Sequence, residues 1–190
     1  MNSLVTRFNI IAVLLIVSAA AGAAQTPSLD YDKLQAETAQ RLSEYLRINT
    51  SNPPGNELAT AHWLKEVLAR EGIEGQILDT AELGPGRANF YARLKGSGSG
   101  KAIALVHHMD VVPVTGEPWA VAPFAGVIKD GYVWGRGALD MKGHGIIQLM
   151  TLIAIKRSGF CSSGIWSLSE MLMRNPVDPA VRASSPGTRI

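Results

Sequence analysis

Two clusters of polar residues in the middle of the chain contain side chains that bind divalent metal ions. His108 and Asp110 follow directly after an apolar run, and Asp140 lies in a glycine-rich segment further along. Residues two apart in an extended backbone point to the same side, so the carboxylate of Asp110 can orient the imidazole of His108. A carboxylate can bridge two divalent cations while a histidine binds one of them, so His108 and Asp140 would make half of a two-metal centre. The chemistry that these residue types indicate is the binding of divalent metal ions.

The spacing of these residues is also compatible with purely structural roles that involve no metal. His107 would face away from the first cluster, and one of the two adjacent histidines could be an ordinary surface residue, with Asp110 capping a turn. Asp140 could cap the helix that follows it. The cations Arg136 and Lys142 could balance the charge of Asp140, but salt bridges that fix the loop are an equal alternative.

Two further residues near these clusters are expected to have no chemical role. His144 lies four residues after Asp140 and could share a metal with it from one helix face, but a histidine on the helix surface is the simpler expectation. Trp119 is expected to pack rather than to serve as a platform for substrate.

The composition limits the kind of protein and the kind of metal site. The chain has 190 residues, 46% of them hydrophobic and 18% charged, with a formal net charge of +2, which fits one globular domain. It has no basic run, so no nucleic-acid partner is expected. Cys161 is the only cysteine, which excludes an internal disulfide framework and a thiolate metal cluster. A metal site must therefore use histidine and carboxylate ligands.

The elements that would position these residues alternate between helix and strand. Apolar residues at helical spacing predict three helices, over 32–47, 56–72 and 141–157. Short apolar runs bounded by turn residues predict three strands and a hairpin, over 76–78, 88–94, 102–107 and 127–134. Asn56 and Gly72 are placed to begin and end the second helix. The unbroken apolar run from Ile103 to Val106 is typical of a strand covered on both faces, so the fold class is α/β.

The first 24 residues have the pattern of a secretory signal peptide. Arg7 precedes an almost wholly apolar stretch over 10–21, and the small residues Ala21, Ala23 and Ala24 allow cleavage before Gln25. A membrane anchor is the alternative, but the apolar run is shorter than the roughly 20 residues that cross a bilayer. The expected mature chain is secreted or periplasmic and keeps no stable association with a membrane.

Four segments, in this order along the chain, carry a family resemblance: Asn-Pro-Pro-Gly-Asn-Glu (52–57), His-Met-Asp-Val-Val-Pro (108–113), Trp119 with Pro123-Phe124, and Asp130-Gly131 followed by Gly-Arg-Gly-Ala-Leu-Asp-Met-Lys-Gly (135–143). They resemble the co-catalytic zinc metallopeptidase family, which contains aminoacylase, acetylornithine deacetylase, succinyl-diaminopimelate desuccinylase and glutamate carboxypeptidase. The resemblance covers about residues 34–160. It implies a mixed sheet flanked by helices.

The resemblance also implies roles for the residues of the two clusters. His108 would bind one metal, Asp110 would be the catalytic residue that orients it, and Asp140 would bridge both metals. The implied cofactor is Zn²⁺, two ions per site, with Co²⁺ or Mn²⁺ as possible replacements. The implied substrate is a small peptide or an N-acyl amino acid, whose amide carbonyl is polarised by zinc and attacked by an activated water.

Part of the family pattern is absent from this sequence. The family has a Glu-Glu pair about thirty residues after the bridging aspartate, which supplies the general base and a ligand, then a further acid, a histidine, and a lid or dimerisation domain. None of these is present, so we expect a truncated, inactive product, with a homodimer possible only for a full-length form. A non-catalytic binding module and a functionless pseudogene product are the alternatives.

Residues 161–190 are expected to be an aberrant tail with six serines, three prolines and no helical or alternating period. When the last base of each codon is joined to the first two bases of the next, permitted codons give Asp-Met-Val-Phe-Val-Gly-Asn-Ala over 164–172. The same frame continues with Asp-Glu-Glu-Ser-Gly-Gly over 172–178, which resembles the missing motif. The expected organisation is a signal peptide (1–24), the N-terminal part of a metallopeptidase catalytic domain (25–160) and a frameshifted tail (161–190).

Overall fold

The computed structural model describes residues 28–98, 100–160 and 164–171. The expected signal peptide, Cys161 and the segment 172–190 lie outside the described residues. Three helices are present: α2 (Tyr31–Leu46), α3 (Glu57–Arg70) and α4 (Lys142–Arg157). The strands are β1 (Gly75–Asp79), β2 (Ala88–Leu94), β3 (Ala102–His108), β4 (Val127–Lys129), β5 (Tyr132–Trp134) and β6 (Ile165–Met171), and a short 3₁₀ helix covers Ala81–Leu83. No described helix is both long enough and apolar enough to cross a bilayer.

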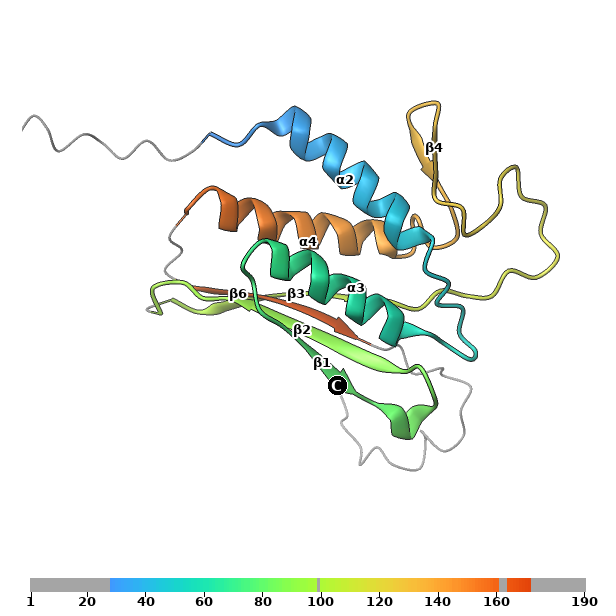
Figure 1. Cartoon of the computed structure of the whole chain (residues 1–190), viewed down its shortest axis with the longest axis horizontal. Helices are drawn as coiled ribbons and strands as arrows, with labels where there is room; N and C mark the ends of the chain where they lie inside the picture. The colour runs from blue at the N-terminus through green and yellow to red at the C-terminus, as the bar shows by residue number, and fades with distance from the viewer. Residues whose placement is uncertain (1–27, 99, 161–163, 172–190) are drawn as a thin grey trace, which may run out of the picture.

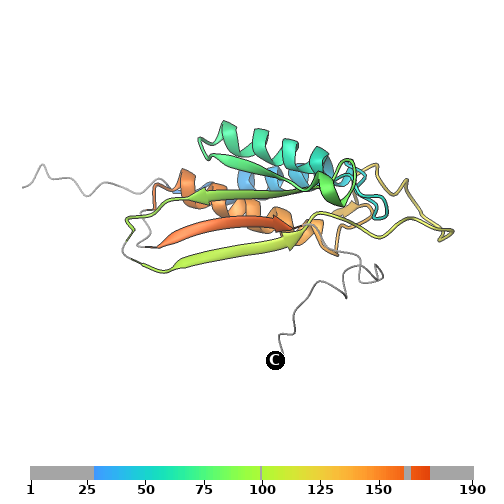
Figure 2. The same cartoon turned by 90° about the horizontal axis from the view of Figure 1, so that it is seen from below.

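The main sheet is mixed, as the family resemblance implies. Its strand order is β1-β2-β6-β3, with β3 and β6 parallel and the other neighbouring pairs antiparallel. The strands β4 and β5 form a separate hairpin. All three helices lie on one face of the main sheet (Figure 1; Figure 2). This side of the sheet positions the candidate site, because the polar clusters lie where β3 ends and where α4 begins.

The local signals that predict the helix ends agree with the structure in part. The cap of α2 is a residue that was not predicted: the side chain of Asp30 accepts a hydrogen bond from the backbone N–H of Lys33 at 3.1 Å. Asn56 is the residue before α3, but its side chain makes no capping bond there and donates instead to the carbonyl of Asn49 at 3.3 Å. Gly72 follows α3 with a positive φ of 67°, as expected for a left-handed terminator.

The core lies between the helices and the sheet. Apolar residues of α3 and α4 pack against the inner face of the strands, and the most deeply buried include Leu64, Leu68, Leu149, Leu152, Ile153, Phe90 and Leu168. Tyr45 at the end of α2 stacks on Trp63 of α3 with ring centroids 5.4 Å apart. These contacts fix the ends of α2 and α4, which flank the candidate site.

The strand β3 corrects one expectation of the sequence analysis. Its apolar run predicts burial on both faces, but Ile103 is 47% exposed and Val106 is 41% exposed. In the described part of the chain β3 is an edge strand, and the helices cover only one face of the sheet. The apolar run therefore marks a strand correctly but does not show how many of its faces are covered here.

The strand β6 corrects a second expectation. No helical or alternating period was expected after residue 160, yet Ile165–Met171 pairs with β2 on one side and β3 on the other. Leu168 is fully buried and Trp166 packs against the core. Trp166 and Leu168 alternate with serines, which is the period of two that a half-buried strand requires, but the run is only seven residues long.

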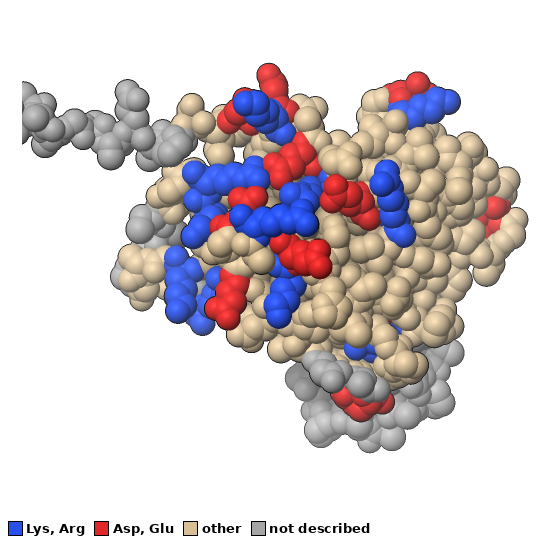
Figure 3. Space-filling view, in the orientation of Figure 1, with Lys and Arg blue, Asp and Glu red and all other residues tan. Residues whose placement is uncertain are grey.

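Charged side chains are interspersed on the face of the molecule shown in Figure 3, without a large region of one sign. Arg157 at the end of α4 contacts Glu37 of α2 at 2.7 Å and Glu71 beside α3 at 2.5 Å. This ion-pair group connects the three helices at the edge of the core.

Candidate metal centre

The first polar cluster is held by backbone pairing between residues 50–52 and the segment that follows β3. The N–H of Val111 donates to the carbonyl of Thr50 at 3.1 Å, and the N–H of Asn52 donates to the carbonyl of Val111 at 2.9 Å. The hydroxyl of Thr50 donates to the carbonyl of Met109 at 2.7 Å. His108 ends β3 directly before this paired segment, so its backbone is fixed from both sides.

The side chain of Asp110 lies against the imidazole of His108. The Nδ1 atom of His108 is 3.0 Å from the backbone carbonyl oxygen of Asp110 and 3.2 Å from its carboxylate Oδ1. A carbonyl oxygen can only accept, so Nδ1 carries the proton and donates. In the neutral ring this leaves the lone pair on Nε2, which is the form that binds a metal.

Asp140 approaches the other side of the same ring. Its Oδ1 lies 3.4 Å from Nε2 of His108, although one residue ends β3 and the other lies in the loop before α4. The Asp140 side chain is 88% exposed. The structure thus brings together His108, Asp110 and Asp140.

The distance between His108 and Asp140 fits a shared zinc ion. Zinc bound to a histidine nitrogen and a carboxylate oxygen at about 2.1 Å each, with tetrahedral angles, leaves about 3.4 Å between the two donor atoms. An imidazole nitrogen and a carboxylate oxygen are also the donor types that zinc accepts. These two side chains are therefore suitable as a pair of ligands.

The ligand set is nevertheless small. Within the described residues, no group of three or more His, Cys, Asp or Glu side chains is arranged to hold a metal ion. The Asp110 carboxylate faces Nδ1 of His108 and the amide of Asn52, which donates to Asp110 Oδ2 at 2.9 Å. Two candidate ligands are fewer than the three protein ligands of an ordinary catalytic zinc site.

The hydrogen bonds around Asp110 act on both titrating groups of the cluster. Burial alone would raise the pKa of the Asp110 carboxyl, but hydrogen bonds from His108 and Asn52 outweigh it and the pKa is lowered. The hydrogen bond to Asp110 raises the pKa of His108, against the opposing effect of burial. The arrangement is that of an ionised carboxylate that orients an imidazole.

A pocket of about 460 Å³ opens beside these residues. His108, Asp110, Asp140, Trp119 and Arg136 are among the residues that line it. The guanidinium of Arg136 lies 5.0 Å from the ring centroid of Trp119. Trp119 therefore packs against a side chain, as expected, and also borders the pocket.

The two cations beside Asp140 have structural partners. Arg136 forms an ion pair with Glu117. Lys142 is fully buried and donates from Nζ to the carbonyl of Ile48 at 2.6 Å and to the carbonyl of Tyr45 at 3.2 Å. Its burial lowers the pKa of Lys142 to about 7. Arg136 therefore has the loop salt bridge that the sequence left open, whereas Lys142 is held by backbone carbonyls rather than by a carboxylate.

The remaining histidines near the site lie apart from it. His107 faces the opposite side of β3, where it is buried, and its Nδ1 is 3.0 Å from Oε1 of Gln148 on α4. His144 is exposed on α4, as expected for a helix-surface histidine.

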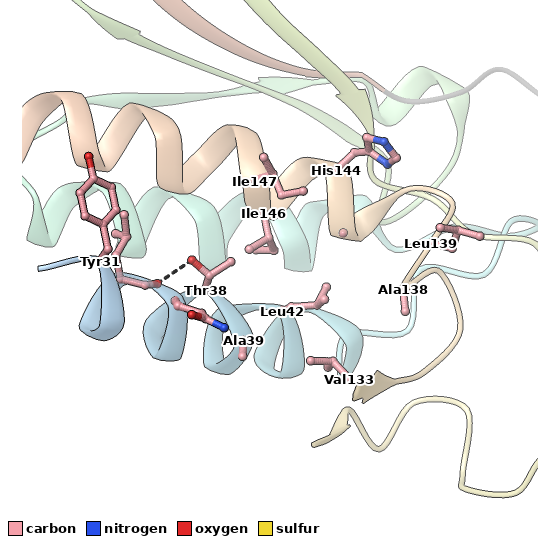
Figure 4. A pocket seen from close by; sticks show the side chains of 13 residues that line it. Tyr31, Thr38, Ala39, Leu42, Val133, Ala138, Leu139, His144, Ile146 and Ile147 are labelled. Carbon is pink, nitrogen blue, oxygen red and sulfur yellow. Dashed lines mark hydrogen bonds between the residues drawn. The ribbon is translucent and has the colours of Figure 1, made fainter. Parts of the chain in front are cut away.

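His144 borders a second cavity of about 640 Å³ between α2 and α4. This cavity is lined mainly by apolar side chains, including Leu42, Ile146 and Ile147 (Figure 4). Its polar lining side chains are a minority and include no carboxylate, whereas the pocket beside His108 is lined by two aspartates and is therefore the better candidate site for a metal.

Three residues that support the centre were not predicted from the sequence. Asn52 and Glu57 belong to the motif at 52–57, which gave them no role of their own, and Arg87 belongs to none of the quoted motifs. Arg87 donates from Nη1 to Oδ1 of Asn52 at 2.9 Å, and its Nε lies 3.0 Å from Oε2 of Glu57. Burial raises the pKa of Glu57, although the charge of Arg87 opposes this. The available signal was one arginine directly before an apolar strand, which is weak on its own.

Comparison with known proteins identifies the same family. Residues 104–165 match the model of "Peptidase family M20/M25/M40". A probable succinyl-diaminopimelate desuccinylase of Staphylococcus aureus (strain MRSA252) is 34% identical over 131 residues, which cover 68% of this chain and 30% of that protein. A succinyl-diaminopimelate desuccinylase of Granulibacter bethesdensis is 42% identical over 80 residues, which cover 42% of this chain and 20% of that protein. The chain thus spans less than a third of the length of these relatives.

Solved structures show the same fold. Human carnosine dipeptidase 1 superposes with a TM-score of 0.64 at 20% identity, covering 80% of this chain and 35% of that one. An M20 family metallo-carboxypeptidase from Sulfolobus solfataricus superposes with a TM-score of 0.60 at 24% identity, covering 70% of this chain and 30% of that one. The chain is thus similar in sequence to peptidase family M20/M25/M40, and its described part has the fold of these solved structures.

Proposed function

We propose that this chain carries half of a two-zinc centre for hydrolysis of an amide bond in a small peptide or an N-acyl amino acid. The observation that supports the proposal most directly is the 3.4 Å approach of His108 Nε2 and Asp140 Oδ1 at the edge of a pocket. When bound there, zinc would act as a Lewis acid on the amide carbonyl. Co²⁺ or Mn²⁺ could replace zinc, because imidazole and carboxylate ligands accept both.

The residues of the chain would prepare the site in three ways. Asp110 holds the proton of His108 on Nδ1 and so keeps Nε2 available as a ligand. Asp140 directs its carboxylate to the same point from the loop before α4. Trp119 and Arg136 border the space in which part of a substrate would lie.

We further propose that the chain with this sequence is inactive by itself. Two ligands bind zinc weakly, and the general base that the family resemblance implies has no counterpart among the identified residues. A shift of the reading frame over residues 161–190 would explain why the general base and the other ligands are missing. The match to the family model ends at residue 165. The strand β6 is compatible with either frame, because the shifted frame also encodes an apolar strand there.

Metal analysis and nucleotide sequencing test these proposals. After dialysis against zinc, we expect the 190-residue chain to retain fewer than two zinc ions, and retention of two would contradict the proposed ligand deficit. Sequencing downstream of Phe160 tests the frameshift, since AGA or CGT at Arg174 would abolish the glutamate reading. A frame-restored protein should hydrolyse N-acyl amino acids, and His108→Ala and Asp140→Ala should abolish that activity.

We also propose that the protein is exported to the periplasm or secreted. The support is the basic and then apolar pattern of the first 24 residues. Mass spectrometry of the product in extracytoplasmic fractions should find an N-terminus near Gln25. A product that retains Met1 in the cytoplasm would contradict the proposal.

A further inference from the structure

Arg87 lies buried behind the candidate metal centre, surrounded by the segment 52–57. Its Nη1 donates to Oδ1 of Asn52 at 2.9 Å and to the carbonyl of Pro54 at 2.8 Å. Its Nε lies 3.0 Å from Oε2 of Glu57. The side chain of Glu57 is fully buried and that of Arg87 is only 9% exposed. A buried guanidinium is thus paired with a buried carboxylate and with two oxygens of one loop, which compensates the cost of removing it from water.

Gly55 leaves the space for this arrangement. A Cβ atom at this position would lie 2.6 Å from Nη1 of Arg87 and 2.8 Å from Oε1 of Glu57. The glycine also has a φ of +89°, a conformation that other residues rarely adopt. The loop therefore approaches Arg87 as closely as it does because residue 55 has no side chain.

The contact with Arg87 determines which way the Asn52 amide points. A guanidinium has only donors, so the atom of Asn52 that faces Arg87 must be the amide oxygen. The amide nitrogen is consequently turned to Oδ2 of Asp110, to which it donates at 2.9 Å. The other carboxylate oxygen of Asp110 faces Nδ1 of His108 at 3.2 Å. A continuous series of polar contacts thus runs from Glu57 to His108.

We propose that Arg87 and Asn52 are positioning residues that hold Asp110, and through it the His108 ring, in the orientation that binds zinc. The inference rests on the proposed function and extends it to side chains that do not touch the metal. It also gives the segment 52–57 a physical role, because Asn52, the carbonyl of Pro54, the space at Gly55 and the charge of Glu57 all meet Arg87. Outer partners of this kind typically change metal affinity by about 10- to 100-fold.

Asn52→Ala and Asn56→Ala form a matched pair of variants that tests the proposal. Both remove an asparagine from the same segment, but the Asn56 side chain donates to the carbonyl of Asn49 and not to Asp110. The 190-residue chain is titrated with zinc while the His108 ring signals are followed by NMR. We expect Asn52→Ala to weaken zinc binding about tenfold, at the lower end of that range, and Asn56→Ala to leave it unchanged.

Arg87→Lys provides a second, independent variant. Lysine keeps a positive charge near Glu57 but lacks the planar fork that holds Asn52 and the Pro54 carbonyl together, so zinc binding should weaken here as well. Circular dichroism establishes whether each variant is folded. If Asn52→Ala does not fold, the affinity of folded Arg87→Lys decides the question.

The outcomes separate this inference from the proposed function. If zinc perturbs His108 equally in the parental chain, Asn52→Ala and Arg87→Lys, the positioning role is wrong while the metal site stands. If both variants lose their fold whereas Asn56→Ala keeps it, the role is structural only and the inference is likewise overturned. If zinc does not perturb His108 in the parental chain, the proposed metal centre itself fails, and this inference with it.

Discussion

The ammonium group of Lys142 lies 2.6 Å from the backbone carbonyl oxygen of Ile48, in the turn that follows α2. The same group donates to the carbonyl of Tyr45 and lies 4.6 Å from the centroid of the Tyr45 ring. The end of α2 and the start of α4 are thus joined by one buried side chain, two residues after Asp140.

Replacement of this lysine tests its structural role. Lys142→Met keeps most of the stem but leaves the carbonyl of Ile48 without the lysine donor and the carbonyl of Tyr45 with only the N–H of Ile48, so the free energy of unfolding should fall by about 1–3 kcal/mol. Denaturant unfolding of the variant measures this loss. Lys65→Met, on the exposed side of α3, is the matched control and should change stability by no more than about 0.5 kcal/mol. Equal stability of the two variants would contradict the role assigned to Lys142.

Gly145→Ala should destabilise the protein although alanine is the better helix former. A Cβ atom at residue 145 would collide with the imidazole of His107 on β3. Overpacking costs about 1–3 kcal/mol, whereas the gain in helix propensity is about 1 kcal/mol. Thermal unfolding should therefore show a lower midpoint for Gly145→Ala. When His107→Ala is added to Gly145→Ala, part of the lost stability should be recovered. If the stability changes of the two single variants simply add in the double variant, the collision is not the cause.

Arg157 should make stability depend on pH through Glu37. The hydrogen bonds from Arg157 hold the pKa of Glu37 below its usual value of 4.5, so the contribution is present above that pH and is lost as the pH falls through the lowered pKa. Arg157→Gln should cost no more than about 1 kcal/mol near pH 7, because the group is partly exposed. The difference between variant and parent should shrink in acid, as followed by urea unfolding at several pH values. Arg70→Gln, an exposed change at the end of α3, should show no such convergence.

The neutral form of His108 should carry its proton on Nδ1. The carbonyl of Asp110, 3.0 Å away, accepts only and therefore excludes the other tautomer. Long-range ¹H–¹⁵N correlation spectra of the folded chain distinguish the two nitrogens. A dominant Nε2–H form would be incompatible with Nε2 as a zinc ligand.

Local sequence signals were sufficient for most of the elements. The spacing of apolar residues predicts all three helices, and Gly72 marks the end of α3 through its left-handed backbone, so these elements follow from short segments. The strand β6 was overlooked because only two apolar residues, Trp166 and Leu168, carry its alternation toward the core. The exposure of β3 could not be predicted, because an apolar run does not specify which neighbours cover it.

The site was predictable where its parts are close in sequence and not elsewhere. His108 and Asp110 are two residues apart, so the period of an extended strand brings them together. Arg87 and Asn52 are 35 positions apart, and only the packing of β2 beneath the loop before α3 makes them neighbours. In the sequence, an arginine directly before a strand cannot be distinguished from an ordinary surface cation. The burial of Arg87 in the structure is what indicates that it has a specific role.

The separate origins of His108 and Asp140 have a thermodynamic consequence. One residue ends a strand and the other precedes a helix, so an ion bound between them would act as a removable cross-link within the chain. Mass action then requires that the ion raise the melting temperature in proportion to the logarithm of its free concentration once that concentration exceeds the dissociation constant. Occupancy of the centre and integrity of the surrounding loops are therefore one coupled equilibrium.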